Sequence, residues 1–143
     1  MRILVTAGGT REPIDAVRVI ANTSTGRLGA CIVDEARRIG HEVVLLHGVH
    51  AVRPETAGES HVFDASAELS ALLARLVPGA DAVIHAAAVS DFLPERAAGK
   101  LSSDPDELVL RLRRAPKLID ALRAQCPSGQ LVGFKLTSGL EEP

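Results

Sequence analysis

The first thirty residues constrain the fold more strongly than any other part of the chain. A short apolar run, residues 2–6, ends in the paired glycines Gly8 and Gly9, and a helical pattern of apolar residues begins at Arg27. An apolar, β-branched run that ends in glycines is typical of the first strand of an open α/β sheet, in which ligands bind beyond the carboxyl ends of the strands. We therefore expect the ligand site within residues 7–29.

Apolar runs and helical patterns alternate along the rest of the chain. Residues 7–25 are expected to form a long loop. We expect helices at 27–39, at 115–125, and from the capping residue Ser66 to Pro78-Gly79. Strands are expected at 41–46, 62–63, 81–88, 107–113 and 130–136. Residues 89–106 are expected to form a mobile flap. This order predicts an α/β fold with a doubly wound, Rossmann-like, mostly parallel sheet, helices on both of its faces, and a single domain at 1–143.

The spacing of apolar residues also predicts which side of the first helix is buried. Leu28, Cys31, Ile32 and Ala36 recur at helical intervals, so we expect them to pack on the sheet. Cys31 and Cys126 have no Cys or His partner at metal-binding spacing, and we interpret both as small buried hydrophobic residues. We expect neither a disulfide nor a zinc site.

Composition excludes several classes of function. The chain has 143 residues and a formal net charge of −2, so it offers no basic surface for nucleic acid or anionic lipid. It contains no apolar run of the roughly 20 residues that span a membrane, and we expect a cytoplasmic protein. There is no tyrosine, which excludes catalysis by a tyrosine acid.

Ser24, Thr25 and Gly26 directly precede the first helical pattern. Their hydroxyl and backbone N–H groups would form an anion-binding helix N-terminus, so a phosphorylated or carboxylated ligand is expected there. The chain lacks both the G-x-G-x-x-G spacing of dinucleotide-binding folds and a G-x-x-x-x-G-K-[ST] loop. Hydride transfer in an NADP-binding, reductase-like domain is therefore an alternative of lower rank.

Five segments together carry a resemblance to a known family. They are TAGGTREPID at 6–15, VRVIANTSTGRLG at 17–29, AAAVSDF at 86–92, GKLSS at 99–103 and VGFKL at 132–136. In order and spacing they resemble phosphopantothenate–cysteine ligase, also called phosphopantothenoylcysteine synthetase. The serines after Lys100 are similar to those of the stand-alone enzymes. Family members continue beyond the last segment, so the resemblance implies that the chain is shortened at its C-terminus.

The resemblance implies a ligase of coenzyme A biosynthesis. The carboxylate of 4′-phosphopantothenate would attack the α-phosphorus of CTP or ATP, and cysteine would then displace the nucleotide. Cationic groups, N–H donors and Mg²⁺ would neutralise the negative charge that this attack brings together. The family also implies a homodimer. A non-catalytic nucleotide-binding paralogue or fragment is the alternative of a different class.

The family's functional residues carry over to positions that match its motifs. Asn22 matches the asparagine that contacts the acyl intermediate, Arg18 a required arginine, and Lys100 the flap lysine that closes over the intermediate. No metal-binding residue is implied. The implied nucleotide-binding positions are Gly8, Gly9, Ser24, Thr25, Gly26, Ala87, Ala88, Asp91, Phe134 and Lys135.

Overall fold

The centre of the molecule is a five-stranded sheet in which every neighbouring pair of strands is parallel. The computed structural model describes residues 1–136. The strand order is β5-β4-β1-β6-β9, made by β1 (Arg2–Ala7), β4 (Glu42–Gly48), β5 (Ser60–Phe63), β6 (Ala82–His85) and β9 (Gln130–Gly133). These strands follow the expected apolar runs, because strands that are covered on both faces must be apolar on both faces.

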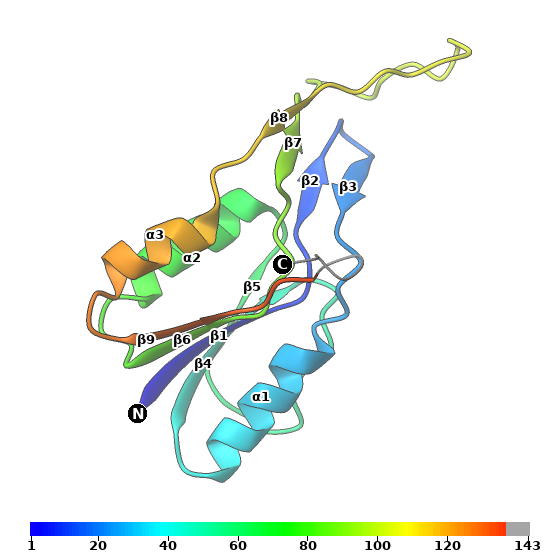
Figure 1. Cartoon of the computed structure of the whole chain (residues 1–143). Coiled ribbons are helices and arrows are strands. Elements are labelled where there is room, and N and C mark those ends of the chain that lie inside the picture. The colour runs from blue at the N-terminus through cyan, green and yellow to red at the C-terminus, as the bar shows by residue number, and fades with distance from the viewer. Residues whose placement is uncertain (137–143) are drawn as a thin grey trace, which may run out of the picture.

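Helices cover both faces of the sheet (Figure 1). One face carries α1 (Arg27–Arg38), and the other carries α2 (Ser66–Leu76) and α3 (Leu118–Gln125). The chain builds β1, β4 and β5 outward in one direction and then returns to place β6 on the other side of β1. The predicted doubly wound α/β fold is therefore confirmed, and its switch point lies between β1 and β6.

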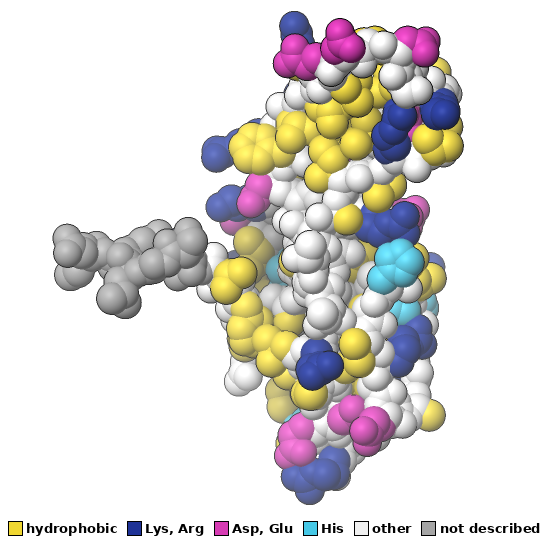
Figure 2. Space-filling view, turned by 90° about the vertical axis from the view of Figure 1, so that its right-hand side faces the viewer, with side chains coloured by type: hydrophobic (Ala, Val, Ile, Leu, Met, Phe, Trp, Pro, Cys, Tyr) yellow, Lys and Arg dark blue, Asp and Glu magenta, His cyan; other side chains and the backbone are white. Residues whose placement is uncertain are grey.

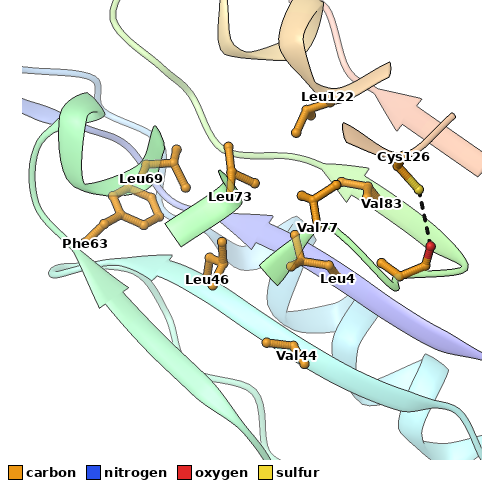
Figure 3. Close-up of a cluster of buried hydrophobic side chains, with 11 residues drawn as sticks. Leu4, Val44, Leu46, Phe63, Leu69, Leu73, Val77, Val83, Leu122 and Cys126 are labelled. Carbon is orange, nitrogen blue, oxygen red and sulfur yellow. Dashed lines mark hydrogen bonds between the residues drawn. The ribbon is translucent and has the colours of Figure 1, made fainter. Parts of the chain in front are cut away.

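The larger of the two clusters of buried apolar side chains lies between the sheet and the α2–α3 layer (Figure 3). Phe63, Leu69 and Leu122 are fully buried there. Cys126 lies at the edge of this cluster, where its thiol donates to the carbonyl oxygen of Ala80 at 3.2 Å. The interpretation of Cys126 as a small buried residue is confirmed.

The buried side of α1 differs from the predicted one. Leu28 is 52% exposed and Cys31 is also exposed, so the interpretation of Cys31 as buried was wrong. The buried residues are Gly29, Ala30, Val33 and Ala36. A Cβ atom at Gly29 would lie 2.4 Å from the Cβ of Ala7, so only a glycine lets the helix approach β1 this closely.

Two short antiparallel hairpins project from the carboxyl end of the sheet (Figure 1). The first, β2 (Arg11–Pro13) with β3 (Val19–Ala21), occupies the segment 7–25 that was predicted to be a loop. The second pairs β7 (Phe92–Pro94) with β8 (Leu112–Arg114), so the strand predicted at 107–113 begins later and is shorter. The predicted flap at 89–106 includes β7, and its residues 95–106, called the flap below, lie in the long connection between β7 and β8.

The N-terminus of α2 is stabilised by a distant carboxylate and not by a serine cap. The capping position is Ala65, and Ser66, which was predicted to cap the helix, makes no side-chain capping bond. Instead, the buried carboxylate of Glu12 accepts the N–H of Ser66 at 3.0 Å. A negative charge is favourable at this end of a helix dipole. No helix within residues 1–136 is long and apolar enough to cross a membrane.

Candidate functional site

Backbone groups from two segments meet beyond the carboxyl ends of β1 and β6. The N–H of Ala88 donates to the carbonyl of Gly8 at 2.8 Å, and the N–H of Thr10 donates to the carbonyl of Ala88 at 3.1 Å. Gly9 and Ala88 form a parallel bridge that extends the pairing of the two strands. The structure thus brings the predicted residues Gly8, Gly9 and Ala88 together at the switch point, where an open α/β sheet binds its ligand.

Asn22 ties this junction to the hairpin. Its side-chain amide donates to the carbonyl of Ala88 at 3.0 Å and to the hydroxyl of Ser90 at 3.3 Å. Ser90 also contacts the hydroxyl of Thr10 at 3.0 Å. The amide oxygen of Asn22 has no hydrogen-bond partner among residues 1–136, so it remains available to a ligand.

Gly8 and Gly26 bring the start of α1 against the end of β1. Both have positive φ, +85° and +73°, and a Cβ atom on either would lie 2.8 Å from the Cβ of Ala51. The loop after β4 therefore packs over both glycines. Gly26 occupies the capping position of α1 without any side-chain cap. The hydroxyl of Thr25 accepts the N–H of Arg27 at a long 3.4 Å.

A buried pair below the junction holds Ala87. The hydroxyl of Thr6 accepts the N–H of Ala87 at 3.1 Å and lies 2.9 Å from Nδ1 of His85. The Thr6 hydroxyl can therefore donate its proton to an unprotonated Nδ1. Burial lowers the pKa of His85 below its usual value, which agrees with a neutral imidazole.

A second group of polar residues lies at the turn of the β2–β3 hairpin. The buried carboxylate of Asp15 accepts the N–H groups of Val17 and Arg18, at 2.8 and 2.7 Å, and the guanidinium of Arg18 at 2.6 Å. It also accepts the N–H of Leu101 at 3.0 Å. The bond from Val17, followed by those from Leu101 and Arg18, outweighs desolvation and lowers the pKa of Asp15 to about 2.

The predicted catalytic residues do not all meet in one place. Arg18 precedes β3 and Asn22 follows it, so four residue steps of extended chain, about 13 Å, separate their Cα atoms. Lys100 is exposed in the flap, next to Leu101, whose carbonyl accepts the Arg18 guanidinium at 3.3 Å. The structure therefore associates the Lys100 segment with Arg18 and places Asn22 at the other end of the hairpin.

Asp91 lines an open pocket of about 490 Å³ between β7 and the start of α3. Arg114 and Lys117 also line this pocket and supply positive charge, and Asp120 adds a second carboxylate. Phe134 and Lys135 follow β9, whose register places Gly133 beside His85 of β6. Phe134 is 54% exposed and is not part of the hydrophobic core.

No group of three or more metal-binding side chains occurs within the described part of the chain. Among the junction residues Gly8, Gly9, Asn22, Ala88 and Ser90, none carries a carboxylate. Hard cations such as Mg²⁺ are held in proteins chiefly by carboxylate oxygens. The junction residues therefore do not fit a metal ion that the protein alone would hold.

Sequence reasoning missed five polar residues that organise the two groups. Asp15 and Ser90 lie inside the family-like segments and could have been chosen from them, as could Thr10. An aspartate side chain commonly accepts the backbone N–H of the residue two positions later and so forms a turn. Thr6 and His85 could not have been paired from the sequence, because their contact depends on the register of β1 with β6.

Comparison with known proteins extends over nearly the whole chain. The family model described as the DNA/pantothenate metabolism flavoprotein C-terminal domain matches residues 1–142. The Coenzyme A biosynthesis bifunctional protein CoaBC of Thermococcus kodakarensis is 39% identical over 142 residues, which are 99% of this chain and 35% of that protein. The chain thus spans about a third of the length of this curated relative.

Solved structures agree with the sequence comparison. The DNA/Pantothenate Metabolism Flavoprotein from Streptococcus pneumoniae has a TM-score of 0.88 and 32% identity, over 94% of this chain and 69% of that one. A Cab2 mutant in complex with phosphopantothenate-cysteine has a TM-score of 0.78 over 96% of this chain and 64% of that one. At 21% identity, the Cab2 structure shows the shared fold. The chain belongs to the family of the DNA/pantothenate metabolism flavoprotein C-terminal domain.

Proposed function

We propose that this chain joins 4′-phosphopantothenate to cysteine, as a phosphopantothenate–cysteine ligase. The observation that carries the proposal is the junction of Gly8, Gly9 and Ala88, to which Asn22 links the hairpin. This junction lies at the switch point of the sheet, in a chain that matches the family over residues 1–142. The name of the Thermococcus relative, a coenzyme A biosynthesis protein, supports the proposal. So does the ligand of the Cab2 structure, which is phosphopantothenate-cysteine.

The reaction has two steps. A carboxylate oxygen of phosphopantothenate forms a bond to the α-phosphorus of the nucleotide, and the bond to the departing pyrophosphate breaks. The amine of cysteine then attacks the acyl carbon, and the nucleoside monophosphate leaves with one of the original carboxylate oxygens. The amine loses its proton as the amide forms.

Both steps create negative charge that backbone N–H groups can stabilise without reorganisation. The start of α1, near Ser24, Thr25 and Gly26, directs N–H groups toward the carboxyl edge of the sheet and suits a phosphate chain. Asn22 is held by two bonds from its amide nitrogen, which leaves its amide oxygen to contact the acyl group. In this assignment Asn22 binds the acyl intermediate.

Arg18 and Lys100 supply the positive charge. The guanidinium of Arg18 uses Nη1 for Asp15 and Leu101, while its Nε and Nη2 have no partner among residues 1–136. These donors suit a phosphate or carboxylate oxygen. Lys100 is exposed, precedes Leu101 in the β7–β8 connection, and would bind an anionic group beside Arg18.

The nucleotide is CTP or ATP and enters as its magnesium complex, since the junction residues offer no carboxylate for a separate ion. Asp91, with the nearby Lys117, lines the pocket that would take the ribose or base. Ala87, Phe134 and Lys135 lie along the same edge of the sheet and would complete that contact.

The active form is a homodimer in this proposal. Figure 2 shows hydrophobic side chains gathered at the end of the molecule that carries β7, β8 and their connection. Val109 is 72% exposed, and the other exposed apolar residues of this segment are Phe92, Leu108, Leu110 and Leu112. Exposed apolar patches of this kind mark association surfaces. Replacing Val109 with aspartate should produce a monomer, which light scattering after size exclusion would detect.

Release of pyrophosphate by the purified chain tests the proposal. CTP and ATP are compared in the presence of Mg²⁺, with and without phosphopantothenate, and with and without cysteine. Release that requires phosphopantothenate supports the ligase assignment and identifies the nucleotide. Nucleotide binding without any release supports the non-catalytic alternative.

A further inference from the structure

We infer that Asp15 is a positioning residue: its carboxylate fastens the flap at Leu101 to the turn that carries Arg18, so that Arg18 and Lys100 bind one anionic group together. This inference rests on the proposed function for the roles of Arg18 and Lys100. The attachment itself rests on the geometry of the hairpin turn and the flap.

Leu101 is held at both of its backbone polar groups. Its N–H donates to Oδ2 of Asp15 at 3.0 Å, and its carbonyl accepts Nη1 of Arg18 at 3.3 Å. A third bond, from the N–H of Ala97 to the carbonyl of Ile14 at 2.9 Å, fastens the same flap to the same turn. Three bonds thus join segments that lie more than eighty residues apart in the sequence.

The two oxygens of Asp15 perform different tasks. Oδ1 accepts the N–H groups of Val17 and Arg18 and closes the hairpin turn. Oδ2 accepts the Arg18 guanidinium and the N–H of Leu101. Oδ2 therefore connects the turn to the flap, while Oδ1 maintains the turn itself.

This division determines the best substitution. In Asp15→Asn the amide oxygen can take the place of Oδ1 and keep the turn closed. The amide nitrogen then faces two donors, Leu101 N–H and Arg18 Nη1, where no hydrogen bond can form. The substitution is expected to release the flap and to leave the turn in place.

The attachment matters because it fixes the residue next to Lys100. Because Asp15 and Arg18 hold Leu101, the neighbouring backbone at Lys100 cannot move independently of the Arg18 guanidinium. A flap that is already in position spares the entropy of ordering it when the transition state forms. Loss of the attachment should therefore lower the rate of the chemical step more than the affinity for the nucleotide.

Cleavage of the native protein by trypsin measures the attachment directly. The Lys100–Leu101 bond contains the N–H that Asp15 accepts, and cleavage of a native protein follows the population of the locally opened form. Asp15→Asn should accelerate cleavage after Lys100 by about tenfold, because it removes hydrogen bonds to a charged group. Mass spectrometry of the fragments assigns the site.

Two controls separate release of the flap from general unfolding. Asp106→Asn removes the charge of an exposed carboxylate in the same connection and should leave cleavage after Lys100 unchanged. Cleavage after Arg38, at the end of α1, should be equal in all variants. Equal acceleration at Arg38 and Lys100 would mean that Asp15→Asn unfolds the whole domain, and would overturn the inference.

A second pair of variants tests the same bond from the side of the flap. Leu101→Pro removes the N–H that Asp15 accepts, whereas Leu101→Ala shortens the side chain and keeps that N–H. The inference predicts faster cleavage of the flap after Arg96 in the proline variant than in the alanine variant. Equal rates in these two variants would contradict it.

The positioning role is read from kinetics. In Asp15→Asn, kcat for pyrophosphate release should fall about tenfold, while KM for the nucleotide changes less than twofold. Faster cleavage together with an unchanged kcat would overturn the positioning role. If the unmodified chain releases no pyrophosphate, the proposed function fails, while the cleavage experiments still decide whether Asp15 fastens the flap.

Discussion

Asn22 offers a prediction in which the more conservative substitution does more damage. Its amide nitrogen donates to the carbonyl of Ala88 at 3.0 Å and to the hydroxyl of Ser90 at 3.3 Å. In Asn22→Ala both acceptors keep another donor, since Thr10 donates its N–H to Ala88 and its hydroxyl contacts Ser90. The expected loss in the free energy of unfolding is therefore only about 1 kcal/mol.

Asn22→Asp keeps the shape of the side chain but puts a carboxylate oxygen where the amide nitrogen donates. Two oxygens without a proton between them would then meet at the Ala88 carbonyl. Because these partly buried oxygens then face each other without a hydrogen bond, the expected loss in the free energy of unfolding rises to about 3 kcal/mol. For a domain of this size, the two losses correspond to falls in Tm of about 3 °C and about 9 °C.

Urea unfolding at pH 7.5 and at pH 4 measures both effects. At the lower pH the introduced carboxyl takes up a proton that it can donate to the Ala88 carbonyl, so the deficit of Asn22→Asp should shrink while that of Asn22→Ala stays constant. An aspartate variant as stable as the alanine variant at pH 7.5 would refute the assigned orientation of the amide. Such a result would also remove the argument that the amide oxygen faces the ligand.

Three further predictions concern the frame of the site. Gly26→Ala should cost about 2 kcal/mol of unfolding free energy, measured by urea titration, because its φ is +73° and a Cβ atom there would be crowded. The control Gly40→Ala should cost about 1 kcal/mol, because Gly40 has φ +89° but open space around it. Glu12→Ala should lower the free energy of unfolding by about 2 kcal/mol, because its bond to the N-terminus of α2 is lost. Thermal unfolding of both variants should show a far smaller loss for Ser66→Ala. Because the pKa of His85 is lowered in the folded protein, the unfolded chain binds more protons near pH 6. The Tm should therefore fall as the pH drops below about 6.5, and His85→Gln should reduce this fall.

The sheet could be predicted from the sequence because its strands are apolar on both faces. Runs such as Val43-Val44-Leu45-Leu46 have few alternatives in a folded chain. The buried side of α1 could not be predicted in the same way. Its contact with β1 depends on Gly29, a small residue that hydrophobic periodicity ranks below Leu28.

The arrangement of the candidate site could be predicted only in part, for a related reason. The junction of Gly8, Gly9, Asn22 and Ala88 lies within family-like segments, and β1–β6 pairing brings these segments together. The bond between Asp15 and Leu101 spans 86 residues and depends on how two short hairpins lie side by side. The three-residue strands of these hairpins are too short to leave a periodic signal.

The fate of the carboxylate oxygens of 4′-phosphopantothenate tests the central claim most directly. The substrate is labelled with ¹⁸O in its carboxylate, the reaction is completed with cysteine and the preferred nucleotide, and the products are analysed by mass spectrometry. An acyl-nucleotidylate mechanism predicts one ¹⁸O atom in the nucleoside monophosphate and none in pyrophosphate. Label in inorganic phosphate, with formation of a nucleoside diphosphate, would contradict the account.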